Sequence, residues 1–234
     1  MNIRIVTLFP EFFTSPLTTG LLGRAVAGGK ISVDLIDIRK YSDDPHRRCD
    51  DYPYGGGSGM VLVPGPLFRA LDDAAVQSSG IIFLSPSGRL LTQSLVKELA
   101  AGGEMCLVCG NYEGIDQRVI ERYGGREVSI GDYVLSGGEF AALVLLDAVA
   151  RYAPGFMSNE RSLDEESFED FLLEYPHYSR PAAIEGMQVP QVLLDGDHAA
   201  VERWRLERRI EKTRAERPDL YRQYLIRKIR GETK

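Results

Sequence analysis

The chain has 234 residues, of which 44% are hydrophobic and 26% are charged, a composition typical of soluble globular proteins. No apolar run reaches the roughly 18 residues that a transmembrane helix needs, and the first residues lack the basic and apolar regions of a secretory signal. Three cysteines give no disulfide framework. These features exclude membrane-spanning and disulfide-rich classes and predict a cytoplasmic protein without membrane association.

The net charge of −6 is distributed unevenly along the chain. Residues 202–234 contain twelve Lys/Arg and six Asp/Glu and carry +6, whereas residues 1–201 contain 16 Lys/Arg and 28 Asp/Glu and carry −12. A basic segment on an otherwise acidic protein indicates a polyanionic partner, although a solvated helical face would have the same composition.

Short β-rich apolar runs alternate with helical patterns over the first two-thirds of the chain. This alternation predicts βαβ units and an α/β fold with a mostly parallel sheet. The predicted strands are 3–8, 31–38, 81–84, 105–109 and 126–130, and the predicted helices lie near 16–27, 65–78, 92–101 and 114–123.

Two of the cysteines, Cys106 and Cys109, form a C-x-x-C spacing inside a predicted strand. Residues three apart on a strand point to opposite faces, and no second cysteine pair is present to complete a zinc site. We therefore expect both to be core residues. The histidines are too scattered to indicate a metal site, so no metal ligand is predicted.

A long apolar helix is expected to follow the segment "SIGDYVLSGGEF". Ser136 and Glu139 have the spacing of a capping box, which would start this helix. The helix is apolar nearly all round and stops at Pro154, so it should be deeply buried or form half of a subunit interface.

The character of the chain changes near residue 157. An acidic, polar segment follows, and beyond it a basic helical pattern runs to Pro218, where a second short helix begins. We expect a first domain at 1–157, a flexible linker at 158–168 and a helical second domain at 169–234.

Glycine-rich loops follow three of the predicted strands, at 85–89, 110–116 and 130–138. Ligands bind outside the carboxyl ends of strands in open α/β sheets, so these loops are expected to converge on one small molecule. No lysine or arginine is common to the three loops, which favours a neutral or zwitterionic ligand with an aromatic part. Ordinary turns are the alternative interpretation.

A fourth loop, 43–60, combines glycines with Tyr52, Tyr54, His46, Arg47 and Arg48. Aromatic and basic side chains together suit stacking on bases and contact with phosphates, as in recognition of single-stranded RNA. A flexible surface loop is the alternative. The residues alone thus indicate an α/β protein that binds a small ligand and RNA.

Six motifs occur in the order found in one known family. They are "LFPEFF", "DDYPYGGGSGM", "LSPSGR", "VCGNYEGIDQRV", "SIGDYVLSGGE" and "PHYSRP…EGMQVPQVLLDGDH". Together they span nearly the whole chain, which resembles the bacterial tRNA (guanine-N1)-methyltransferases of the SPOUT superfamily. The resemblance implies a deep trefoil knot in the C-terminal part of the first domain, followed by a small helical tRNA-binding domain. It further implies an obligate homodimer whose active site is shared between subunits.

The same resemblance implies S-adenosylmethionine as methyl donor and leaves a requirement for Mg²⁺ open. The reaction would methylate N1 of the guanosine immediately 3′ of the anticodon in tRNA, giving 1-methylguanosine and S-adenosylhomocysteine. Rival interpretations are a non-catalytic RNA-binding or cofactor-sensing module on the same fold, and a related knotted methyltransferase acting on a ribose 2′-OH or another base.

Matching motif positions imply two sets of binding residues. The cofactor would contact Leu84, Ser85, Pro86, Gly110, Tyr112, Glu113, Ile130, Gly131, Asp132, Tyr133, Val134, Leu135, Gly137 and Gly138. The RNA would contact His46, Arg47, Asp50, Gly56, Gly57, Arg203, Arg208 and Arg209.

N1 of guanine carries a proton at neutral pH, so methylation needs a base near N1 and positive charge near O6. In the family an arginine and an aspartate fill these roles. Arg151 matches the arginine, and Glu166 stands at the aspartate position, with Asp164 as the nearest substitute. Asn111 is a second departure, because the family usually shows a basic or imidazole side chain there.

Overall fold

The computed structural model describes residues 1–75, 77, 80–157 and 166–231, and the chain divides into two compact units, Met1–Ser158 and Asn159–Lys234. Residues 158–165 of the predicted linker, with Asp164 among them, lie outside the described residues.

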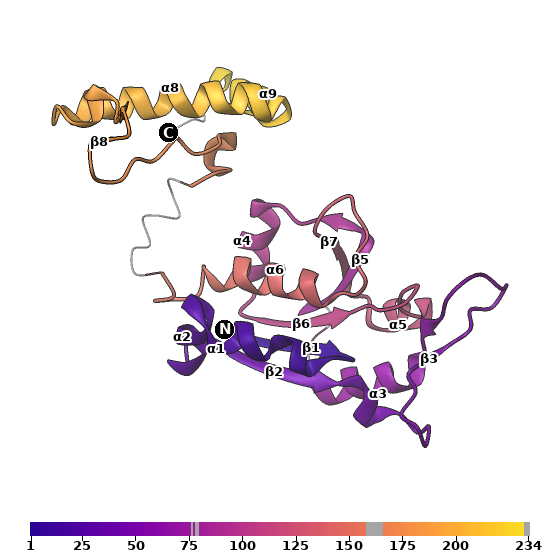
Figure 1. Cartoon of the computed structure of the whole chain (residues 1–234). Coiled ribbons are helices and arrows are strands. Elements are labelled where there is room, and N and C mark those ends of the chain that lie inside the picture. The colour runs from indigo at the N-terminus through magenta and orange to yellow at the C-terminus, as the bar shows by residue number, and fades with distance from the viewer. Residues whose placement is uncertain (76, 78–79, 158–165, 232–234) are drawn as a thin grey trace. The chain divides into compact units, whose positions relative to one another are not determined.

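The first unit is built on a five-stranded sheet with the strand order β2-β1-β6-β5-β7 (Figure 1). Every neighbouring pair is parallel, which confirms the predicted α/β class. The strands are β1 (Asn2–Thr7), β2 (Ser32–Asp37), β5 (Ile81–Leu90), β6 (Glu104–Cys109) and β7 (Arg126–Ser129).

Helices connect these strands where the apolar periodicity predicted them. They are α1 (Thr14–Thr18), α2 (Gly20–Ala27), α3 (Pro64–Ala74), α4 (Gln93–Ala101), α5 (Gln117–Tyr123) and α6 (Glu139–Ala150), with 3-10 turns η1 (Pro10–Phe13) and η2 (Ile38–Tyr41). A short antiparallel pair, β3 (Asp50–Asp51) and β4 (Val61–Leu62), closes the base of the glycine-rich loop.

Strand residues alternate between two apolar cores, one on each face of the sheet. One core contains buried residues of α2, α4 and α6, and the other contains those of α3 and α5. Cys109 belongs to the first and Cys106 to the second, which confirms that the C-x-x-C spacing places them on opposite faces as core residues. Burial raises the pKa of the Cys106 thiol to about 12, so the thiol stays protonated.

The expected capping box at the start of α6 is wrong. The helix begins at Glu139, its N-cap is Gly138, and no side chain caps it. Glu139 therefore occupies the first helical position instead of the third, and its carboxylate accepts hydrogen bonds from Thr7 and Asn111.

Only one side of α6 is buried, although its sequence is apolar nearly all round. Leu145 and Leu146 are fully buried, whereas Phe140 and Val144 are 54% and 49% exposed. The ring of Phe12, on η1, lies 4.8 Å from that of Phe140. Together with Val144, one helical turn beyond Phe140, these two residues form an apolar strip, defined here as Phe12, Phe140 and Val144.

The second unit is mostly helical, and its longest element is the predicted basic helix. It contains η4 (Glu169–Phe171), a hairpin of β8 (Ala183–Ile184) and β9 (Met187–Gln188), η5 (Gln191–Leu193), α8 (His198–Glu216) and α9 (Pro218–Ile229). Asp197 caps α8 by accepting from the amide of Ala200. The break before α9 falls at Pro218, as predicted.

Candidate functional site

A pocket of about 410 Å³ lies in the first unit, at the carboxyl ends of three neighbouring strands. The irregular middle of β5 and the loops after β6 and β7 surround it, and the first turns of α5 and α6 complete its wall. The structure thus brings together the three glycine-rich loops that sequence reasoning expected to converge. Its volume is in the range of small-molecule sites.

The segment predicted as a loop at 85–89 is instead an irregular stretch inside β5, where the strand pairing is interrupted. Leu84 pairs with Val128, and so does Arg89, so the residues between them have no partners in β7. At Gly88 a Cβ atom would lie 2.4 Å from the backbone of Glu127, so only glycine fits where the chain rejoins the strand. The freed residues Ser85, Pro86 and Ser87 line the pocket.

The loops after β6 and β7 meet through their backbones. Asn111 and Gly137 form an isolated antiparallel bridge, and the Gly138 amide donates a 2.7 Å hydrogen bond to the Gly110 carbonyl. A Cβ on Gly138 would lie 2.8 Å from the Cα of Cys109. Gly138 is therefore needed for the close approach that shapes this side of the pocket.

Most of the residues implied for cofactor binding line this pocket, and Asp132 is the exception. Sequence reasoning missed other lining residues: Phe83, Ser87, Asn111, Gly114, Ile115, Gln117, Ile120, Glu127, Val128, Ser129, Ser136 and Ala141. Several are neighbours of the motif residues, so motif proximity could have signalled them. Glu127 and Gln117 could be found only from the fold.

The charges of the pocket lining have one sign. Glu113 and Glu127 are the acidic residues among those that line it, and no lysine, arginine or histidine does so in the described part of the chain. Such a lining does not suit a phosphate-rich ligand. It fits a zwitterionic ligand, one of the two kinds that the sequence of the loops indicated, and it also fits a cationic one.

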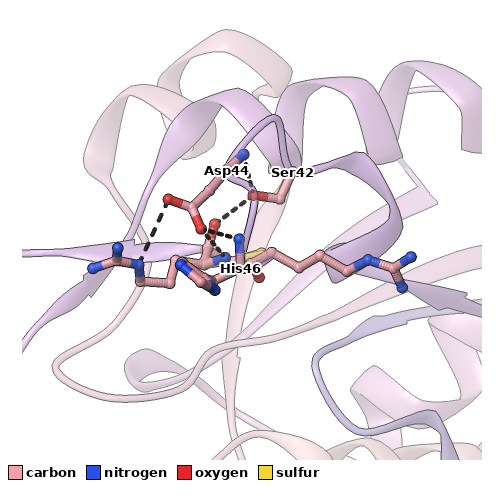
Figure 2. Close-up of polar contacts among 6 residues, drawn as sticks. Ser42, Asp44 and His46 are labelled. Carbon is pink, nitrogen blue, oxygen red and sulfur yellow. Dashed lines mark hydrogen bonds and ion pairs between the residues drawn. The ribbon is translucent and has the colours of Figure 1, made fainter.

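The loop that carries the basic residues is held by a compact turn (Figure 2). Asp44 Oδ1 accepts from the amide of His46 at 2.7 Å and from that of Arg48 at 3.3 Å, while Ser42 Oγ donates to the Arg48 carbonyl. Arg47 adopts a positive φ of 55° between them. The turn holds three consecutive basic side chains at the start of the glycine-rich loop.

The same loop is joined to the pocket by hydrogen bonds. The Glu113 amide donates to the Met60 carbonyl, and the Leu62 amide donates to that of Gly114. Tyr112 lines the pocket, and its pKa is raised by burial and by the negative charge of the neighbouring Asp50. The residues of this loop that are implied for RNA contact and those implied for cofactor contact thus belong to adjoining segments of the first unit, whereas the implied arginines of α8 lie in the second.

The two residues implied for catalysis lie in different units. Arg151 is the C-cap of α6, and at about 1.5 Å per residue it lies about 15 Å along the helix axis beyond Ala141, the last α6 residue that lines the pocket. Glu166 is half-buried in the second unit, where its carbonyl accepts from the amide of Glu169.

The arginines of α8 differ in their surroundings. Arg203 is exposed, whereas Arg208 forms an ion pair with Glu211 at 2.8 Å. Arg209 donates to the carbonyls of Leu173 and Glu169 and so holds the segment that precedes the hairpin. Of the implied phosphate contacts, Arg209 therefore also has a structural role.

No group of three or more His, Cys, Asp or Glu that could hold a metal ion was found among residues 1–75, 77, 80–157 and 166–231. None of the helices in that part of the chain is long and apolar enough to cross a membrane.

The fold and the pocket define a ligand-binding α/β protein with a second unit that carries a basic helix. Residues 1–223 match the family described as tRNA (Guanine-1)-methyltransferase TrmD, and the chain belongs to this family.

Curated relatives support the assignment over almost the whole chain. A tRNA (guanine-N(1)-)-methyltransferase of Chloroflexus aggregans is 52% identical over 223 residues, covering 94% of this chain and 87% of the relative. A protein of the same name from Chloroflexus aurantiacus is 53% identical, and the match covers 94% of this chain and 88% of the relative. One from Gloeobacter violaceus is 50% identical, and the match covers 94% of this chain and 98% of the relative.

Proposed function

We propose that the protein transfers a methyl group from S-adenosylmethionine to N1 of the guanosine immediately 3′ of the anticodon in tRNA. The products would be 1-methylguanosine and S-adenosylhomocysteine. The observation that carries the proposal is the family match over residues 1–223, with relatives named tRNA (guanine-N(1)-)-methyltransferase at about half identity over 94% of the chain. The protein would act in the cytoplasm as a homodimer.

The pocket suits S-adenosylmethionine in size and charge. Its volume is about 410 Å³, and its glycine loops present backbone groups to an adenine and a ribose. Glu113 would lie near the cationic methionine part, and Tyr133, Val134 and Leu135 would contact the adenine. When bound, the cofactor supplies an electrophilic methyl group. The proposal leaves a Mg²⁺ requirement open, and assays with EDTA in place of Mg²⁺ decide it.

The chain's own residues would handle the charge and the proton of the target guanine. Loss of the N1 proton puts negative charge on O6, which the Arg151 guanidinium would stabilise by hydrogen bonding. Glu166 would accept the N1 proton as general base. Comparing Glu166→Ala with Asp164→Ala tests this assignment, because abolition of transfer by the second variant alone would contradict it.

The position of Arg151 supports an active site shared between two subunits. Arg151 lies about 15 Å along α6 from the last pocket residue on that helix, too far for its side chain to reach the pocket of its own chain. The apolar strip exposes Phe12, Phe140 and Val144 on the first unit. We infer that a second copy of the chain covers this strip and that Arg151 acts at the partner's pocket.

Two further features belong to the proposal. The segment after β7 returns to the loop after β6 through the Asn111–Gly137 bridge and the Gly138–Gly110 hydrogen bond, which supports a trefoil knot at the pocket. The basic turn at His46 and Arg47, with Asp50 and the glycines that follow, would approach the bases next to the anticodon. The α8 arginines would meet phosphates, which position RNA without specifying its sequence.

Methyl transfer from labelled S-adenosylmethionine to unmodified tRNA tests the function directly. The substrate carries guanosine at the target position and at the last anticodon position, and the control carries adenosine at the target. Label in 1-methylguanosine that disappears in the control is the expected result. Label in another nucleoside, or binding of cofactor and tRNA without transfer, would overturn it.

A further inference from the structure

We infer that the pocket has an anionic bias, set largely by Glu139 beside its neutral partner Asn111, that favours the positively charged sulfonium cofactor over the neutral sulfide product. The inference rests on the proposed function, because that function supplies this pair of ligands. It adds a discriminating role for residues that the family motifs do not assign to ligand binding.

Glu139 is a buried carboxylate whose hydrogen-bond partners, Thr7 and Asn111, are both neutral. It is 5% exposed, and Oε1 accepts from the Thr7 hydroxyl at 2.8 Å while Oε2 accepts from the Asn111 side-chain amide at 3.1 Å. None of the ion pairs found in the described part of the chain involves Glu139. Its charge is hydrogen-bonded but not cancelled by a cation.

The carboxylate lies directly behind the pocket wall. Asn111 and Gly137 both line the pocket, and a Cβ on Gly137 would lie only 2.5 Å from Oε2 of Glu139. The N-terminus of α6 offsets part of this charge, at most about half an elementary charge. A net negative potential therefore remains at the pocket, one backbone layer from the carboxylate.

The lining reinforces this potential. Glu113 and Glu127 line the pocket, and within the described residues no basic side chain does. Buried lining residues such as Phe83 and Leu84 lower the local dielectric on one side of the pocket, so charges there interact more strongly than in bulk solvent. Asn111 matters because a cationic side chain at this position would neutralise Glu139.

The two ligands of the reaction differ in a way that isolates this effect. S-adenosylmethionine carries one methyl group and one positive charge more than S-adenosylhomocysteine, and the rest of the two molecules is the same. The ratio of their dissociation constants therefore reports how the pocket responds to the charge on sulfur. An anionic bias holds the donor and releases the product after transfer.

Isothermal titration calorimetry of the full-length protein, without tRNA, measures this ratio. The ligands are the sulfonium donor, the neutral sulfide, and an analogue with a protonated amine in place of the S-methyl group. We expect the sulfonium donor and the protonated amine analogue each to have a dissociation constant roughly tenfold lower than that of the neutral sulfide. A roughly tenfold difference is the size of effect expected from one partly screened charge pair. A ratio near one for the wild type would overturn the inference.

Glu139→Gln is the decisive variant, because it removes the charge and keeps the shape. The ratio should fall severalfold, mainly through weaker binding of the two cations. The matched control is Glu121→Gln, an exposed position on α5 that changes the net charge equally and should leave the ratio unchanged. An equal fall in the control would show that net charge, not Glu139, is responsible.

Circular dichroism is used to check that Glu139→Gln folds, and Glu113→Gln provides a second test at an exposed lining residue. It too should lower the ratio, though by less. An unchanged ratio in folded Glu139→Gln would overturn the inference. The two proposals fail differently. A folded wild-type protein that binds no S-adenosylmethionine contradicts the proposed function, whereas binding and transfer with a ratio near one contradict only the anionic bias.

Discussion

The Thr7 hydroxyl donates a 2.8 Å hydrogen bond to Glu139, although the two residues are 132 positions apart in the chain. Both side chains are buried, and the same hydroxyl accepts from the amide of Phe9 at 2.9 Å. The bond joins the carboxyl end of β1 to the first turn of α6. The wall of the pocket therefore depends on a contact made by a strand that does not line it.

Replacing Thr7 by valine removes the hydroxyl and leaves the Glu139 carboxylate short of a donor in a buried site. We expect the free energy of unfolding to fall by about 1–3 kcal/mol, the cost of leaving a buried polar group unsatisfied. Urea unfolding measures the change, and Thr7→Ser, which keeps the hydroxyl, is the control. Equal stability of the two variants would contradict the importance of this bond.

Gly138→Ala should damage the pocket, because the added Cβ would lie 2.8 Å from the Cα of Cys109 and 2.9 Å from the Gly110 nitrogen. Backbone atoms cannot move aside without shifting the loops, and a displacement of about 1 Å can cost on the order of 100-fold in rate. We expect methyl transfer to fall at least about tenfold. Gly65→Ala is the control, because its Cβ would find the nearest atom, on Arg69, only at 3.9 Å.

Mixed dimers test the shared active site. Arg151→Ala removes the charge at the end of α6, and Gly138→Ala disables the pocket, so each homodimer should be nearly inactive. If Arg151 acts at the partner's pocket, a heterodimer has one site with both an intact pocket and an intact arginine. Co-refolding the two variants should then restore measurable transfer. Absence of activity in a mixture shown to contain heterodimers would contradict sharing.

Two arginines of α8 should respond differently to substitution. Arg203 is exposed, so Arg203→Ala should weaken tRNA binding, lower its dependence on salt and leave stability unchanged. Arg209 donates to the carbonyls of Leu173 and Glu169, so Arg209→Ala should lower the thermal stability of the second unit. Filter binding at several salt concentrations and thermal melts separate the two roles. Identical effects would show that the distinction is wrong.

The junction of α8 and α9 should make a pH-dependent contribution to stability. The hydrogen bond from Arg217 is the main factor that lowers the pKa of Asp219, to about 2. Since the ordinary value is about 3.9, the stabilisation is present above about pH 4 and is lost as the pH falls toward 2. Asp219→Asn should therefore lower thermal stability at pH 7 and have less effect near pH 3.

The control for this prediction is Glu207→Gln, an exposed carboxylate on α8. Its effect on the melting temperature should be small at both pH values. An effect of Asp219→Asn that stays constant from pH 7 to pH 3 would show that the Arg217 interaction does not govern this junction.

Sequence reasoning failed at the start of α6 for a physical reason. Ser136 and Glu139 have the spacing of a capping box, but spacing does not determine where the backbone enters helical dihedral angles. The Gly138 amide is bound to the Gly110 carbonyl, and the helix begins one residue later. Glu139 is then free to turn inward, toward Thr7 and Asn111.

The sequence by itself determined the features that depend on near neighbours. Alternating apolar runs predicted the parallel α/β unit, the spacing of Cys106 and Cys109 placed them on opposite faces, and Pro218 separated the last two helices. These depend on local periodicity and on the missing amide of proline. The order of the motifs also identified the family.

Only the tertiary structure decided which distant residues meet. It placed Glu127 and Gln117 in the pocket wall, left Asp132 outside it, and brought Glu139 against Thr7 and Asn111. It also set Arg151 far from the pocket of its own chain. The reason is that the packing of strands and helices fixes contacts between residues far apart in sequence, and no local pattern encodes which of them will touch.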